Sequence, residues 1–124
     1  LGTGAVTFPY TGFSRPLGVA ISADGSFALV GNEGGNTVGN YGGNNVGRID
    51  LGTGAVTFPY TGFSNPVGVA ISADGSFALV GNCSGGNVGR IDLGTGAVTF
   101  PYTGFKEPSG VAISADGSFA LVGN

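Results

Sequence analysis

The sequence predicts an all-β fold built from one four-stranded unit that recurs along the chain. A fifteen-residue stretch occurs three times without change, at residues 18–32, 68–82 and 110–124. A second identical block begins at Leu1, Leu51 and Leu93. Within each copy, short apolar runs alternate with turn sequences. The chain has 27 Gly among its 124 residues, and no long segment shows a helical period, so a helical fold is not expected.

The repeated stretch predicts two strands joined by a tight hairpin. In the first copy, residues 19–21 are small or β-branched, and the Asp24-Gly25 pair that follows supplies the positive φ angles of a hairpin turn. Residues 27–30 form a continuous apolar run, which is typical of a strand covered on both faces. We therefore expect an inner strand with small side chains, followed by a buried second strand.

The segment between two repeated stretches predicts the other two strands. Residues 46–51 alternate, with Ile49 and Leu51 on one face and charged side chains on the other, as in a half-exposed strand. After a Gly-Thr-Gly turn, residues 55–60 include Pro59, which lacks the N–H of a ladder residue and favours an edge. The unit therefore runs from an inner strand to an outer one.

This strand order favours a β-propeller, in which four-stranded antiparallel blades stand around an axis. Propeller repeats are typically about 40 to 45 residues long. The second and third copies here begin 42 residues apart, which fits that length. A stacked β-solenoid is the alternative, although solenoid repeats are usually about 20 to 30 residues long.

One copy of the repeat resembles the blade of NHL and YVTN β-propellers. The resemblance is carried by the pattern Pro-x-Gly-Val-Ala-Ile-Ser-x-Asp-Gly-x-x-Ala-Leu-Val-x-Asn at residues 66–82 and by Val-Gly-Arg-Ile-Asp-Leu at residues 88–93. It covers nearly the whole chain and implies the propeller fold. It leaves the activity open, because such propellers serve as binding modules, scaffolds and occasionally enzymes.

The length predicts a single partial propeller domain over residues 1–124. Its repeats cover residues 1–50, 51–92 and 93–124. They hold eleven strands, or about three blades, in an open arc, whereas complete propellers have about 4 to 8 blades. A third strand between residues 119–122 and the outer strand at residues 5–10 is lacking, and large apolar faces are rarely left in water. The partners expected there are the remaining blades of a longer chain, of which this is a fragment, or other copies of this chain.

Charge and composition exclude several classes of partner. The net charge is −3, and the four basic residues are scattered, which argues against a nucleic-acid ligand. The sequence contains no run of about 20 apolar residues, which is the length that would predict a membrane span. Cys83 has no second cysteine to pair with, and the sparse charge with abundant Gly, Thr, Ser and Asn favours an extracytoplasmic location, whether secreted, periplasmic or at the cell surface.

The repeats differ in two loops only: the one from each outer strand to the next inner strand, and the one from the second strand to the third. In a meander these two connections lie at the same end of the blade, whereas the unchanged Asp-Gly and Gly-Thr-Gly turns lie at the other. We interpret the variable end as a surface diversified for binding. The alternative is that surface loops simply change faster in sequence, while the tight turns at the other end stay unchanged because their geometry requires Gly. The candidate binding residues on this face are Arg15, Leu17, Glu33, Tyr41, Asn65, Cys83, Lys106 and Glu107.

The first of these inter-strand loops, residues 33–45, is eight residues longer than its counterpart in the next repeat. Its Asn and Gly residues and its single Tyr41 are typical of an adaptable recognition loop, in which Tyr41 is the anchor. A Gly-rich flexible insertion has the same composition. The charged candidates are expected to set the choice of partner.

No set of residues predicts a reaction, a metal site or a cofactor. The chain has no His, which excludes Ser-His-Asp and Cys-His arrangements. Asp24, Asp74 and Asp116 recur in the hairpin turn, where one carboxylate per blade falls short of the about 6 to 8 oxygens of a calcium site. Arg48 with Asp50, and the same pair in the next repeat, predict a surface ladder of ion pairs.

The expected function is therefore that of a non-catalytic binding or scaffolding module, which takes a protein or glycan ligand on its variable face. Two alternatives stay open. The chain is a fragment of a lactonase-like propeller enzyme whose site spans further blades, or it is a structural repeat protein that self-assembles. Hydrolytic turnover favours the first alternative, and ordered assembly of this chain favours the second.

Overall fold

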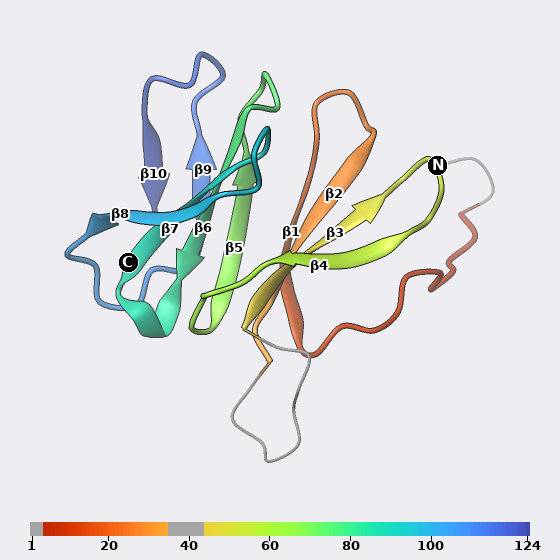
Figure 1. The fold of residues 1–124 in the computed structure, drawn as a ribbon, viewed down its shortest axis with the longest axis horizontal. Helices are drawn as coiled ribbons and strands as arrows, with labels where there is room; N and C mark the ends of the chain where they lie inside the picture. The colour runs from red at the N-terminus through yellow and green to blue at the C-terminus, as the bar shows by residue number, and fades with distance from the viewer. Residues whose placement is uncertain (1–3, 35–43) are drawn as a thin grey trace.

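The computed structural model describes residues 4–34 and 44–124, which form a partial β-propeller with antiparallel blades (Figure 1). Blade 1 contains the strands β1 (Pro16–Ile21), β2 (Phe27–Asn32), β3 (Asn45–Asp50) and β4 (Val56–Tyr60). Blade 2 contains β5 (Pro66–Ile71), β6 (Phe77–Asn82), β7 (Asn87–Asp92) and β8 (Val98–Thr103), with the short 3-10 helix η1 (Cys83–Gly85) between β6 and β7. A half-blade contains β9 (Val111–Ile113) and β10 (Ala120–Val122).

The strands follow the predicted order from the inner strand to the outer one. Each complete blade pairs its strands in chain order, β1-β2-β3-β4 and β5-β6-β7-β8. The second strands β2 and β6 are buried over almost their full length, as a continuous apolar run predicts. Each blade takes its outer strand from the start of the next sequence repeat, so every sheet crosses a repeat boundary.

The largest core lies between the two complete blades. Leu29 and Val46 of blade 1 are fully buried there against Val80 and Ile91 of blade 2. Burying an aliphatic side chain of this size contributes about 1.5 to 3 kcal/mol. Stacking of blade on blade therefore buries the larger of the two apolar cores.

Glycine allows the inner strands of neighbouring blades to approach at backbone distance. A Cβ on Gly18 would lie 2.2 Å from the carbonyl oxygen of Val67, and one on Gly68 would lie 2.3 Å from that of Ser109. The N–H of Gly68 donates across the same contact to the Ser109 carbonyl, at 3.0 Å. The Gly that precedes Val-Ala-Ile in the first two repeats is thus required by the spacing between blades.

The predicted outer strand at residues 5–10 is wrong for this structure. That segment has the same sequence as β4 and β8, yet it is not a strand, and the described residues form ten strands instead of eleven. The physical reason is that an outer strand needs a third strand beside it. Both Asn-Val-Gly-Arg-Ile-Asp segments, β3 and β7, already pair with β4 and β8.

The Asp-Gly turns are closed by their aspartates, which confirms the turn role predicted for these residues. Oδ1 of Asp24 accepts hydrogen bonds from the hydroxyl groups of Ser26 and Ser22, at 2.7 and 2.8 Å, and from the N–H of Ser26 at 3.0 Å. Asp74 repeats these contacts in blade 2. The hydrogen bond from the Ser26 hydroxyl is the largest cause that lowers the pKa of Asp24 to about 2, and the Ser76 hydroxyl does the same for the pKa of Asp74.

We expect these turns to make folding stability depend on acid pH. Because the folded-state pKa lies below the ordinary value of 3.8, the contribution is complete above about pH 4 and is lost as the pH falls toward 2. The triple variant Asp24→Asn, Asp74→Asn, Asp116→Asn should be less stable at pH 7 and should lose less stability between pH 4 and 2. Urea unfolding across that range measures this. Equal pH slopes in both proteins would contradict the assignment.

Candidate functional site

The two loops in which the repeats differ lie at one end of each blade and are hydrogen-bonded to one another. In blade 1, the N–H of Glu33 donates to the carbonyl of Arg15 at 3.2 Å, and that of Gly34 donates to the carbonyl of Ser14 at 2.9 Å. In blade 2, Cys83 donates in the same way to Asn65, at 3.1 Å. The two variable loops therefore lie at the same end of the blade, as the sequence predicted. We call this end the loop face.

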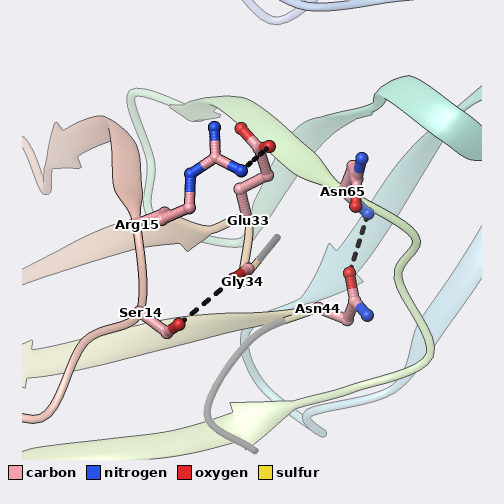
Figure 2. Close-up of polar contacts among 6 residues, drawn as sticks. All are labelled: Ser14, Arg15, Glu33, Gly34, Asn44 and Asn65. Carbon is pink, nitrogen blue, oxygen red and sulfur yellow. Dashed lines mark hydrogen bonds and ion pairs between the residues drawn. The ribbon is translucent and has the colours of Figure 1, made fainter. Parts of the chain in front are cut away.

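Neighbouring blades also touch through these loops. Oδ1 of Asn44, where the long loop of blade 1 meets β3, accepts a hydrogen bond from the N–H of Asn65 at 3.0 Å (Figure 2). One blade further on, Gly86 follows η1 and lies so close to the linker before β9 that a Cβ on it would be 3.1 Å from the Phe105 carbonyl oxygen. The loop face is thus continuous from blade to blade.

An asparagine at the end of each second strand fixes the loop face to the sheet. The side-chain oxygens of Asn32 and Asn82 accept hydrogen bonds from the N–H groups of Ser14 and Ser64. In the half-blade, Asn124 accepts from the N–H of Lys106 at 2.7 Å. Sequence reasoning missed these residues. The signal was an Asn that stays unchanged in all three repeats and that stands directly before a variable loop in the first two.

The side chains of Arg15 and Glu33 pair with each other across the two loops of blade 1. Their charged atoms are 3.2 Å apart, and Arg15 is the more exposed partner (Figure 2). An exposed pair of this kind contributes at most about 1 kcal/mol to stability. Arg15 and Asn65 occupy equivalent positions and both have positive φ angles, 52° and 55°, which sequence reasoning did not anticipate for Arg15.

The remaining candidate binding residues lie at different places. Lys106 and Glu107 are exposed on the linker before β9, and Cys83 is half-buried at the start of η1. Leu17 lies on β1 and is 54% exposed, so it belongs to the inner strand and not to a loop. Tyr41, the predicted anchor, lies outside the described residues.

The expected ladder of ion pairs on the third strands is wrong. The guanidinium of Arg48 lies over the ring of Phe27, 3.8 Å from its centroid, and Arg90 lies over Phe77 in the same way at 4.0 Å. The carboxylate of Asp50 instead accepts hydrogen bonds from the backbone of the Gly-Thr-Gly turn. Arg48 pairs with Leu29, and Phe27 pairs with Asp50, so the guanidinium and the ring are diagonal neighbours on one face of the sheet. A guanidinium over an aromatic ring makes a favourable cation–π contact.

Across residues 4–34 and 44–124, no three side chains of His, Cys, Asp or Glu gather in a group that could hold a metal ion. No helix in these residues is long and apolar enough to span a membrane. A hollow of about 300 Å³ lies between blade 2 and the half-blade, and no residue of the variable loops lines it.

Solved structures resemble this chain over most of its length. A hydrazine synthase of Kuenenia stuttgartiensis is 28% identical with a TM-score of 0.76, over 98% of this chain and 31% of that one. A functionally unknown protein from Desulfotomaculum acetoxidans DSM 771 is 21% identical with a TM-score of 0.64, over 86% of this chain and 34% of that one. This chain thus spans about a third of the length of each. No family model and no curated protein matches the sequence. With the antiparallel four-stranded blades, these likenesses identify the chain as a partial β-propeller.

Proposed function

We propose that this chain is a propeller module of the NHL and YVTN type that binds a protein or glycan ligand through its loop face, without catalysing a reaction. One observation carries the proposal. The two loops in which the repeats differ are held together by backbone hydrogen bonds at one end of each blade, on a scaffold whose sequence does not change.

This arrangement separates the positioning of the loops from the identity of their side chains. Within blades 1 and 2 the loops are joined by backbone hydrogen bonds and by unchanged asparagines, and these bonds persist when a variable side chain is exchanged. A surface ordered in advance loses less conformational freedom when a ligand binds. Variation on a rigid scaffold is the usual basis of a binding face.

Successive blades present different chemistry at one equivalent position. Arg15 is cationic, Asn65 is neutral and Glu107 is anionic, although all three stand directly before the proline that the repeats share. A ligand that spans the blades would meet these groups in a set order. Such a surface discriminates between partners by charge more than it adds affinity.

The likeness to a hydrazine synthase supports the fold and does not supply an activity. It covers 31% of that chain, and catalytic sites are built on folds that host many unrelated functions. The enzyme alternative therefore has no specific observation in its favour among the described residues of this chain.

An oligosaccharide array and a peptide-display library, both probed with the full chain, test the proposal. For any ligand that binds, Lys106→Ala and Glu107→Ala should each weaken binding about tenfold, which corresponds to about 1.4 kcal/mol. The matched control is Ala73→Ser, on the exposed Asp-Gly turn at the other end of blade 2. The proposed face would be refuted if Ala73→Ser weakened binding while Lys106→Ala and Glu107→Ala left it unchanged.

A further inference from the structure

Two phenylalanines lie outside an aromatic pattern that the blades repeat. Phe13 and Phe58 meet edge to face with ring centroids 5.5 Å apart, and the equivalent pair in blade 2 has the same geometry at 5.4 Å. In each pair one ring comes from the linker before the inner strand and the other from the outer strand of the same blade. By position in the repeat, Phe105 is the next linker ring and Phe8 is an outer-strand ring. Neither pairs with an aromatic ring in the part of the chain that the structure describes.

Phe105 lines a hollow where its aromatic partner would lie. The hollow of about 300 Å³ between blade 2 and the half-blade is also lined by Leu79, Val88 and Tyr102. At the corresponding place between blades 1 and 2 there is a closed core, which includes the outer-strand residues Val98 and Phe100 of blade 2. The hollow is therefore the same interface without a third and an outer strand, because the half-blade contains only β9 and β10.

The segment with the outer-strand sequence is present in the chain but lies in solvent. Val6 and Phe8, the equivalents of Val98 and Phe100, are 77% and 86% exposed. The half-blade thus lacks the side chains that the start of the chain exposes.

The outer faces of blade 1 and the half-blade are the two halves of an interface that the chain already makes. Leu29 and Val69 are buried together between blades 1 and 2. Their sequence equivalents are Leu121 on the half-blade, which is 67% exposed, and Val19 on blade 1, which is 62% exposed. Each exposed face therefore has a known complement, because identical residues pack together inside the molecule.

We propose that a second copy of this chain docks head to tail on the half-blade. Blade 1 of the second copy covers Leu121 with its Val19, as blade 2 covers Leu29 with Val69. The segment before blade 1 of that copy packs over the half-blade without joining its sheet, because no third strand lies between them, and it places Val6 and Phe8 in the hollow with Phe8 against Phe105. The new interface continues the blade stacking within the chain, and it is heterologous, so that each copy keeps one open face for a further copy.

The close approach of inner strands gives this proposal a specific signature. Gly110 is the third copy of Gly18 and Gly68, and a Cβ on it would meet nothing within 4 Å in the isolated chain. In the docked pair it would face the backbone carbonyl of Leu17 in the second copy. Gly110→Ala should therefore leave the fold intact and block the association.

Sedimentation velocity of the full 124-residue chain over a dilution series tests the association. The wild type should form species larger than the 12.1 kDa monomer. Val19→Asp and Leu121→Asp each damage one face and should each raise Kd at least about tenfold. Mixed together, the two variants should form a 1:1 heterodimer, because each retains one intact face. Circular dichroism checks that these exposed substitutions leave the fold unchanged.

The segment that enters the hollow is tested with a matched pair of variants. Phe8→Ala should weaken association at least about tenfold, whereas Thr7→Ala should leave it unchanged, because neighbouring residues of an extended segment point to opposite sides. Three results would overturn the proposal. The first is a wild type that is monomeric at all concentrations, as expected if only blades of a longer polypeptide cover these faces. The second is an association that Gly110→Ala or Phe8→Ala leaves intact. The third is a mixture of Val19→Asp and Leu121→Asp that fails to form the heterodimer.

Discussion

Gly68→Ala should lower the free energy of unfolding by about 3 kcal/mol, the upper end of the usual cost of overpacking a close contact. The added methyl would lie 2.3 Å from the carbonyl oxygen of Ser109 and 2.9 Å from the Cα of Gly110. Both obstacles are backbone atoms, so no side chain can rotate away, and the hydrogen bond between Gly68 and Ser109 would be strained as well. Urea unfolding followed by circular dichroism measures the loss.

Gly110→Ala is the matched control for this prediction. It makes the same chemical change at the same position of the repeat, where the added methyl would meet nothing within 4 Å. We expect no loss of stability, and a gain of up to about 1 kcal/mol, because Ala restricts the unfolded chain more than Gly does. Both variants are to be compared at a concentration at which the wild type is monomeric. Equal losses at Gly68 and Gly110 would contradict the spacing of the inner strands.

Asn82→Ala should lower the free energy of unfolding by about 2 kcal/mol. The side chain of Asn82 is 3% exposed, accepts a hydrogen bond from the N–H of Ser64 and donates to Oδ1 of Asn87 at 2.8 Å. Truncation leaves both partners without these bonds in a half-buried place, and an unsatisfied polar group costs about 1 to 3 kcal/mol. Hydrogen exchange at the Ser64 amide should also become faster, because the loop face loses its attachment to β6.

The equivalent variant in the half-blade is the control. Asn124 accepts a hydrogen bond from the Lys106 N–H in an exposed place, where water can replace the lost partner. Asn124→Ala should therefore change the free energy of unfolding by less than about 0.5 kcal/mol. A larger loss at Asn124 than at Asn82 would show that burial is not the cause.

Sequence reasoning predicted the strands and turns of the blades because both depend on local chemistry. The continuous apolar run of β2, the alternation in β3 and the proline in β4 each specify how far a strand lies from solvent. The Asp-Gly turn specifies where the chain reverses. Because a meander alternates direction, the same residues also placed the two variable loops at one end of the blade.

The failures share a different cause, which is dependence on neighbours that the local sequence does not contain. Residues 5–10 have the sequence of an outer strand but no third strand to pair with. Arg48 has a carboxylate two residues away, yet it lies over Phe27 on the neighbouring strand. The role of Asn32 depends on Ser14, 18 residues away along the chain. Residues 5–10 and 55–60 thus have the same sequence, yet only the second segment has a third strand beside it and pairs as a strand.

A nitroxide label on Cys83 tests the central claim most directly, because Cys83 is the single cysteine of the chain and begins one of the variable loops. We expect the label to broaden the amide NMR signals of Ser64, Asn65 and Lys106 most strongly. The signals of the Asp74-Gly75 and Gly-Thr-Gly turns, at the far ends of six-residue strands of about 20 Å, should be the least affected. Stronger broadening of the turns than of the loops would show that the variable segments do not share one face, and the proposed binding surface would not exist.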